Sequence, residues 1–208
     1  MTAVKICGIT RVEDAVAAAH WGANYVGFVL WPNSPRAATL ETVRQIAAEL
    51  PAHVTPVGVF VAPTVAEINA AADAGITLAQ VHASDASEFP GARVPILRAV
   101  HLAGEGIEPA TDDELILLDA HDPTKHGGTG KTIDWQKASQ VARVRKVFLA
   151  GGLTADNVAD AIRAVRPFAV DTASGVEAAP GVKDHHKLKA FILSARNTPP
   201  SEAAYTHE

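Results

Sequence analysis

The sequence contains a single cysteine, Cys7, which excludes an intramolecular disulfide. It also lacks an apolar run of the roughly 18 residues that a membrane-spanning helix needs. Its first ten residues, MTAVKICGIT, have neither the apolar region nor the cleavage site of a signal peptide. These absences predict a cytoplasmic protein with no membrane partner.

Basic residues are too few to form a broad positive field. There are 18 Lys and Arg against 23 Asp and Glu, which gives a net charge of −5. Nucleic acid is therefore not an expected partner, and an anionic ligand would have to be held by a local site. Hydrophobic residues make up 48% and charged residues 20%, as in ordinary globular proteins.

Short apolar runs alternate with alanine-rich stretches of helical periodicity, which is typical of βα units around a parallel sheet. Eight runs in 208 residues predict one closed α/β domain, a (β/α)8 TIM barrel over residues 1–196. Most runs are continuous, as expected for strands covered on both faces. The predicted strands are Val4–Cys7, Tyr25–Leu30, Thr55–Val61, Leu78–His82, Val94–Val100, Leu115–Asp119, Lys146–Ala150 and Phe168–Thr172.

Helical spacing of apolar residues predicts helices at 13–21, 40–50, 64–74 and 155–165. Thr10 with Glu13, and Thr64 with Glu67, have the spacing of a capping box that marks a helix start. The glycines and proline of 101–114 leave little room for a regular helix. The helix between strands five and six is therefore expected to be degenerate. Residues 197–208 lack periodicity and are predicted to be a disordered C-terminal tail.

In such a barrel the active site forms where the strands end at their C-terminal side. Strand one ends in Cys7, strand four in His82 and strand six in Asp119; Asp171 lies near the end of strand eight. Each residue by itself is more often structural than catalytic, a buried cysteine above all. Their convergence on one rim favours a catalytic site.

Two glycine-bearing turns follow strands seven and eight, where phosphate-binding barrels hold their ligand. The first contains Gly151 and Gly152, and the second contains Ser174 and Gly175. Glycine lets the backbone approach closely, and free N–H groups bind the anion. The alternative is two ordinary tight turns; their adjacent placement favours a phosphorylated small-molecule ligand.

The segment 127–132, GGTGKT, is not a Walker motif, because Lys125 stands where that motif requires its first glycine. A glycine-rich lid that closes over the substrate, with Gly128 among the binding residues, is the better interpretation. His121, Asp122 and His126 match no closed zinc spacing. No metal site is predicted.

The ordered combination of motifs resembles the phosphoribosylanthranilate isomerase family of tryptophan biosynthesis over nearly the whole chain. The motifs are KICGIT at 5–10, GFVL at 27–30 with SPR at 34–36, VGVF at 57–60, QVH at 80–82, LLD at 117–119, GGTGKT at 127–132 with DW at 134–135, AGGL at 150–153 with NV at 157–158, SGVE at 174–177 and PGVKD at 180–184.

This resemblance implies an Amadori rearrangement without a cofactor. Asp119 would be the acid that protonates the furanose ring oxygen, which requires a raised pKa, and Cys7 would be the base that removes the C2 proton. The thiolate form requires a pKa lowered from about 8.5. Lys5 is expected on the opposite face of its strand, which leaves the cause of that lowering unidentified.

The resemblance also assigns the aromatic carboxylate of the substrate to Arg36, whose planar guanidinium suits bidentate binding; a surface arginine is the alternative. His82 contacts either the substrate or a hydrogen-bond partner in the barrel mouth. Asp171 belongs to the same binding rim, where it orients loop amides.

Two other functions remain open from the sequence. A histidine-pathway aldose–ketose isomerase would need carboxylates at the ends of strands one and five, where Cys7 and Val100 stand. A phosphosugar-binding barrel without catalysis would have no need of Cys7 and Asp119. The expected oligomeric state is a monomer or a weak homodimer.

Overall fold

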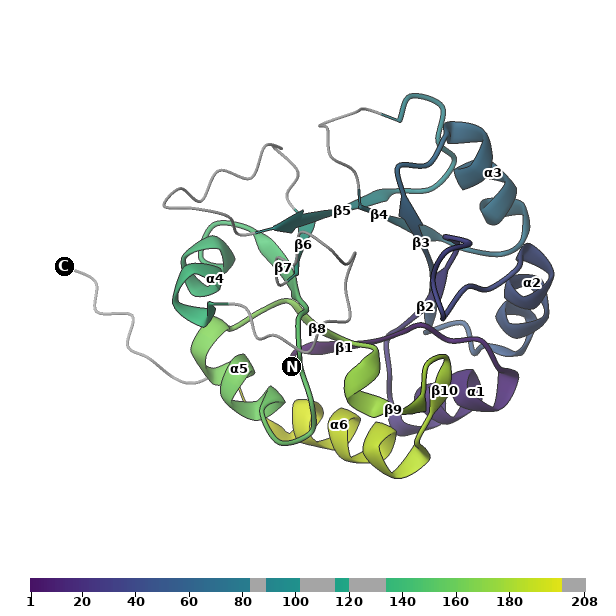
Figure 1. Cartoon of the computed structure of the whole chain (residues 1–208). Coiled ribbons are helices and arrows are strands. Elements are labelled where there is room, and N and C mark those ends of the chain that lie inside the picture. The colour runs from purple at the N-terminus through teal and green to yellow at the C-terminus, as the bar shows by residue number, and fades with distance from the viewer. Residues whose placement is uncertain (83–88, 102–114, 120–133, 200–208) are drawn as a thin grey trace.

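Eight parallel strands form a closed barrel in which each strand pairs with its neighbour in sequence and β8 pairs with β1 (Figure 1). The computed structural model describes residues 1–82, 89–101, 115–119 and 134–199. The predicted single (β/α)8 TIM-barrel fold is confirmed. The strands are β1 (Ala3–Cys7), β2 (Tyr25–Val29), β3 (Thr55–Val61), β4 (Leu78–His82), β5 (Ile96–His101), β6 (Leu115–Asp119), β7 (Lys146–Leu149) and β8 (Ala169–Thr172).

Helices surround the ring of strands in Figure 1. Those within the described ranges are α1 (Val12–Trp21), α2 (Leu40–Glu49), α3 (Val65–Asp73), α4 (Trp135–Ala142), α5 (Val158–Val165) and α6 (His185–Asn197). None of these helices is long and apolar enough to cross a membrane. The crossover at 102–114, where a degenerate helix was expected, lies outside the described residues.

The strands separate two apolar cores because successive side chains alternate between faces. The inner core fills the lower barrel and includes Val57, Leu78, Leu97, Leu117 and Phe148. The outer core packs the other strand faces against the helices. An inner core of buried apolar side chains, each stabilising the fold by about 1.5–3 kcal/mol, forms a packed layer under the upper barrel.

Helix boundaries follow the predictions closely except at two starts. Thr64 and Glu67 form the predicted capping box of α3. The same prediction for Thr10 and Glu13 is wrong: α1 begins at Val12, its N-cap is Arg11 and not Thr10, and the Thr10 hydroxyl donates instead to the Gly181 carbonyl. The helix predicted from 155 begins at Val158, because Thr154 to Asn157 form a side-chain-stabilised turn.

After β8 the chain forms a short 3-10 helix, η1 (Ser174–Val176), and a hairpin of β9 (Glu177–Ala179) and β10 (Val182–Lys183). Helix α6 then packs against α1 and α5. The predicted tail begins at Asn197, which is still the last residue of α6, and from position 200 the tail lies outside the described residues. The hairpin carries two charged side chains, Glu177 and Lys183, into the interior.

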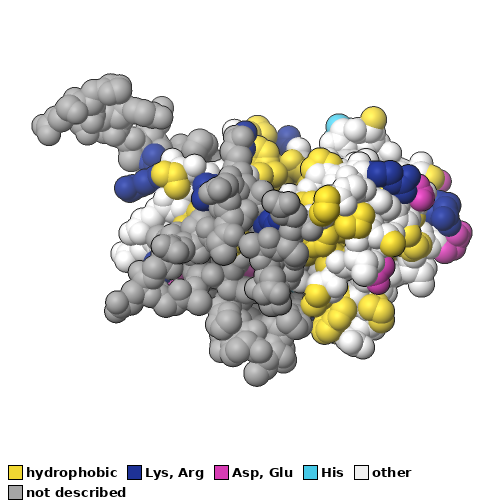
Figure 2. Space-filling model, turned by 90° about the horizontal axis from the view of Figure 1, so that it is seen from above, with side chains coloured by type: hydrophobic (Ala, Val, Ile, Leu, Met, Phe, Trp, Pro, Cys, Tyr) yellow, Lys and Arg dark blue, Asp and Glu magenta, His cyan; other side chains and the backbone are white. Residues whose placement is uncertain are grey.

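Figure 2 shows the barrel from the side, turned by 90° from Figure 1. On the described part of this face, basic and acidic side chains lie beside one another and alternate with apolar patches.

Candidate active site

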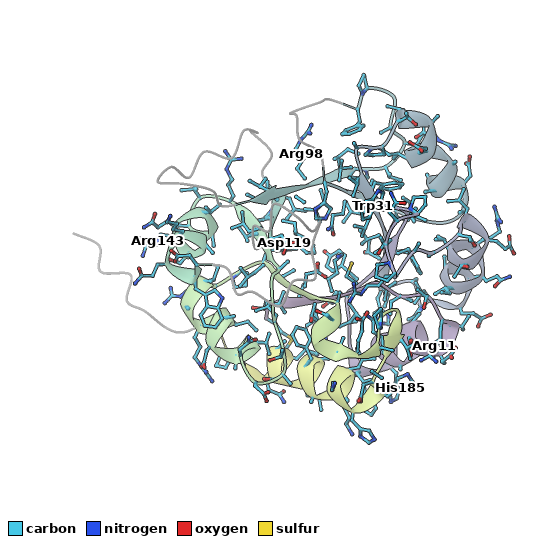
Figure 3. The ribbon with its side chains drawn as sticks, in the orientation of Figure 1. Arg11, Trp31, Arg98, Asp119, Arg143 and His185 are labelled. Atoms are coloured by element: carbon cyan, nitrogen blue, oxygen red, sulfur yellow. The ribbon has the colours of Figure 1, made fainter. Side chains whose placement is uncertain are left out.

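The C-terminal ends of the strands surround one pocket that opens to solvent. Every predicted site residue within the described ranges lines this pocket: Cys7, Arg36, His82, Asp119, Gly151, Gly152, Asp171, Ser174 and Gly175. Figure 3 shows Asp119 inside the ring of strands, whereas Arg11, Arg143 and His185 lie outside it. Gly128, the rest of the predicted lid and the histidines at 121 and 126 lie outside the described residues.

The two turns predicted to bind phosphate are locked against each other. The Thr172 hydroxyl donates to the Leu153 carbonyl at 2.8 Å, so the end of β8 is tied to the turn after β7. A Cβ on Gly175 would collide with that same carbonyl oxygen and would lie 2.8 Å from the Thr172 hydroxyl. Only glycine therefore permits this approach of the two turns.

The side chain of Asn157 stabilises the turn after β7. Its side-chain amide donates to the Gly152 carbonyl at 3.0 Å, and its side-chain oxygen accepts from the Thr154 N–H at 2.8 Å. Gly151 and Gly152 both have positive φ, 92° and 63°, a conformation that glycine adopts without steric cost. The turn is thus preorganised by bonds within the protein.

Cys7 lies above a buried ion pair. Lys5, on the same strand, is fully buried, and its ammonium lies 3.0 Å from Asp171 Oδ2. The expectation that Lys5 faces away from Cys7 is wrong, because residues two apart in a strand share a face. Lys5 and Asp171 are also register partners of β1 and β8, so their side chains meet inside the barrel. Asp171 therefore binds Lys5 through its carboxylate, and the described contacts do not include loop amides.

The electrostatic environment of Cys7 differs from the expectation. Burial raises the pKa of the Cys7 thiol above its ordinary value, and the nearby ammonium groups of Lys5 and Lys183 counteract this only in part. The predicted lowering of this pKa is therefore not found. Desolvation of the thiolate outweighs the favourable charges, an effect that cannot be recognised from one strand sequence.

Asp119 ends β6 and is 7% exposed, with its side chain among the pocket-lining groups. Its Cα is in register with that of His101, the last residue of β5. Strand five thus ends in His101 and not in Val100 as predicted, but a carboxylate is absent from this strand end in either case.

Arg36 reaches the pocket from the segment after β2 and is fixed by Glu177. Its Nε donates to Glu177 Oε1 at 2.8 Å and its Nη2 donates to Oε2 at 2.7 Å. These hydrogen bonds raise the pKa of Arg36. Burial favours the neutral form of Glu177, but the hydrogen bonds from Arg36 and the charge of Lys183 outweigh it, so its pKa is lowered. The pair keeps both charges inside the pocket wall.

Lys183 connects the wall to Cys7. Its buried ammonium donates to the carbonyls of Cys7 and Ala173, at 2.7 and 3.1 Å, and to Glu177 Oε1 at 2.9 Å. Burial lowers the pKa of Lys183, opposed by the charge of Glu177. One ammonium thus joins the ends of β1 and β8 to the hairpin.

His82 and Gln80 share the inner face of β4 at the pocket. Gln80 Nε2 lies 2.8 Å from His82 Nε2, and Gln80 is almost fully buried. His82 therefore has a hydrogen-bond partner in the barrel mouth, one of the two roles expected for it. The amide of Gln80 fixes the orientation of the imidazole.

Sequence reasoning missed four polar residues of this site: Lys5, Gln80, Glu177 and Lys183. Lys5 and Gln80 had a readable signal, since each stands two positions before a predicted site residue and interrupts an apolar strand. Glu177 and Lys183 were part of the recognised motifs but received no role. Among the described residues no group of three or more His, Cys, Asp or Glu side chains could hold a metal ion.

The arrangement can be compared with known proteins. The family model described as N-(5'-phosphoribosyl)anthranilate (PRA) isomerase matches residues 4–194. The chain belongs to this family. It is therefore an aldose–ketose isomerase of tryptophan biosynthesis, as the sequence motifs predicted.

Relatives of the PRA isomerase family match the chain over almost its full length. The N-(5'-phosphoribosyl)anthranilate isomerase of Pelobacter propionicus is 45% identical over 203 residues, covering 95% of this chain and 97% of the relative. The enzyme of Pseudomonas fluorescens is 45% identical over 199 residues, with 92% and 97% covered. The crystal structure of the Thermotoga maritima enzyme superposes with a TM-score of 0.87 at 43% identity, covering 94% of this chain and 99% of that one.

Proposed function

We propose that Cys7 and Asp119 carry out the Amadori rearrangement of N-(5'-phosphoribosyl)anthranilate in this pocket. The observation that supports this is the convergence of a thiol, a carboxyl group, an arginine and two locked glycine turns on one cavity. A related PRA isomerase structure, at 40% identity and TM-score 0.83 with 94% and 99% of the two chains covered, contains reduced 1-(o-carboxyphenylamino)-1-deoxyribulose 5-phosphate.

The reaction begins when the Asp119 carboxylic acid gives its proton to the furanose ring oxygen. The bond between that oxygen and C1 breaks, and the nitrogen lone pair forms a protonated Schiff base. The Cys7 thiolate then removes the C2 proton, and the electrons of that bond form an enolamine. The Cys7 thiol then gives its proton to C1, and the Asp119 carboxylate takes the proton of O2, so that the aminoketone forms and both groups return to their starting protonation states.

Different parts of the pocket bind different parts of the substrate. The turns with Gly151, Gly152, Ser174 and Gly175 bind the phosphate, aided by Gly128 in the lid. Arg36 binds the aromatic carboxylate through Nη1, which donates to no described residue and is left over from the pair with Glu177. His82 and Asp171 line the space between the phosphate site and Arg36, where the sugar binds.

A fluorescence assay tests this function. The anthranilate adduct is fluorescent, so the purified chain should convert it with a loss of signal at a rate proportional to enzyme. A phosphosugar-binding barrel without catalysis would bind the adduct and leave it unchanged. Turnover of a histidine-pathway aldose substrate but not of the anthranilate adduct would favour the other isomerase.

We infer a cytoplasmic protein whose barrel domain spans residues 1–196 and is followed by a C-terminal tail. It uses no cofactor or metal and acts on one phosphorylated small molecule. It binds neither nucleic acid nor membrane. Its state is a monomer or a weak homodimer; a structure of the Thermotoga maritima relative concerns monomers derived from a dimeric enzyme. Gel filtration over a range of concentrations distinguishes the two states.

A further inference from the structure

The upper barrel contains a buried charge to which the proposed reaction assigns no role. Lys5 is fully buried within the ring of strands. Placing an ammonium in such an interior is strongly unfavourable unless it is paired with an opposite charge. Its ion-pair partner is Asp171, whose Oδ2 lies 3.0 Å away, while Oδ1 is buried without a hydrogen bond to the described residues. One carboxylate oxygen of Asp171 is thus the ion-pair partner of Lys5.

Gly27 on β2 creates the space that Lys5 and Cys7 share. It is the register partner of Cys7, and a Cβ built on it would lie 3.3 Å from Lys5 Nζ and 3.0 Å from Cys7 Sγ. The ammonium and the sulfur therefore border the same small gap from two sides. Their separation cannot exceed those two distances combined, an upper limit close to the roughly 4–6 Å within which an opposite charge favours the ionised form of a group.

Other charged groups face Cys7 less directly. Lys183 from β10 binds the Cys7 carbonyl through its ammonium, and Arg36 interacts electrostatically with Cys7 while Glu177 binds both of these cations. Asp171 from β8 opposes ionisation, and Asp119 and His82 border the same pocket. Among these cations, Lys5 has the largest favourable effect on the thiolate.

We propose that Lys5, positioned by Asp171, supplies the positive charge against which Cys7 ionises, so that the buried ion pair is what makes this cysteine a base. The inference rests on the proposed role of Cys7. On ionisation the thiol gives its proton to solvent water. The ammonium stays protonated during turnover, and the thiolate next to it takes the C2 proton and becomes a thiol again.

The ionisation of Cys7 can be measured without substrate, because it is the one cysteine of the chain. Mass spectrometry gives the rate at which iodoacetamide alkylates Cys7 at each pH. The pH at the midpoint of this rate profile reports formation of the thiolate, whatever the access of the reagent. Lys5→Met should raise this midpoint by at least about one pH unit, as expected for loss of an opposite charge at this range. Lys189→Met, which removes an exposed charge from α6, should leave it unchanged.

The single variant leaves Asp171 as an unpaired buried carboxylate, so it can fail to fold. The double variant Lys5→Met/Asp171→Asn removes both charges, and replacing a buried pair as a whole is often tolerated. Its midpoint should also rise, by less than in the single variant, because the opposing charge of Asp171 is lost as well. Circular dichroism shows which variants are folded.

An unchanged or lowered midpoint in a folded variant would overturn the proposal. In the wild type, the midpoint of the acidic limb of the kcat/KM profile against pH should agree with the midpoint of the alkylation profile. In the variants, both midpoints should shift together. Failure of the wild type to turn over the anthranilate adduct would refute the proposed function instead, without any bearing on the measured shift in the thiol. The two conclusions can therefore fail separately.

Discussion

Arg36 and Glu177 form two parallel hydrogen bonds, of 2.8 and 2.7 Å, between residues 141 positions apart in the sequence. The pair joins the segment after β2 to β9 and orients the guanidinium within the pocket. A Cβ on Gly8 would lie 2.7 Å from Arg36 Cδ, so the glycine after Cys7 makes room for this arginine. Glu177 is consequently a positioning residue for substrate binding.

Replacing Glu177 by Gln should raise KM for the anthranilate adduct by about 10- to 100-fold, because charge-assisted hydrogen bonds contribute about 1.5–3 kcal/mol each. The change in kcat should be smaller, since the carboxylate end of the substrate is remote from the reacting carbons. Glu41→Gln is the matched control: it removes an exposed pair with Arg44 and should alter neither constant. A fall in kcat at constant KM would contradict this role.

Loss of either proposed acid–base group should reduce kcat with the fold intact. Cys7→Ser and Asp119→Asn each remove a proton-transfer group while keeping its approximate size, and we expect losses of about 10²- to 10⁴-fold. Steady-state fluorescence assays give the rates, and circular dichroism confirms folding. Near-normal turnover in either variant would refute that residue's assignment.

The sequence predicted those features of the molecule that depend on a local pattern of residues. Strands buried on both faces read as apolar runs, and their C-terminal ends place Cys7 and Asp119 at one rim. The position of Lys5 was equally local, because it is two residues before Cys7; it was missed by assigning it to the wrong face of β1.

Other features depend on residues far apart in the chain. The pair of Arg36 and Glu177 forms only when the hairpin after β8 meets the segment after β2, and no local pattern predicts that meeting. The raised pKa of Cys7 results from burial among several strands of the barrel, and the sequence of β1 alone does not show this burial. Desolvation is a property of the assembled barrel.

Gly175→Ala should destabilise the protein and weaken binding of the phosphate end of the substrate. The added methyl group would collide with the Leu153 carbonyl, and neither turn can move without breaking the bond from Thr172. We expect a loss of about 1–3 kcal/mol in urea unfolding together with a raised KM. Gly91→Ala is a useful comparison for binding: Gly91 does not line the pocket, so KM should be unchanged, although its positive φ of 89° means that this variant should also lose stability.

Asp14 makes the stability of the fold depend on acid pH. Its buried carboxylate accepts two hydrogen bonds from Arg11, at 3.0 and 2.8 Å, and one from the Lys183 N–H, and it pairs with His185. Burial on its own would raise the pKa of Asp14, but these hydrogen bonds outweigh it and lower the pKa. The group joins the starts of α1 and α6 to the hairpin.

Because the pKa of Asp14 is lower in the folded chain than in the unfolded chain, its contribution to stability is complete above the unfolded value of about 4 and is lost as pH falls through the folded value. Asp14→Asn should therefore lower the free energy of unfolding by about 2 kcal/mol at neutral pH, with the difference from wild type shrinking below about pH 4. Asp160→Asn removes an exposed pair with Arg163 at the same three-residue spacing and should have little effect at any pH. Urea unfolding followed at several pH values measures the difference, and a gap that stays constant from neutral to acid pH would show that the Asp14 carboxylate charge does not stabilise the fold.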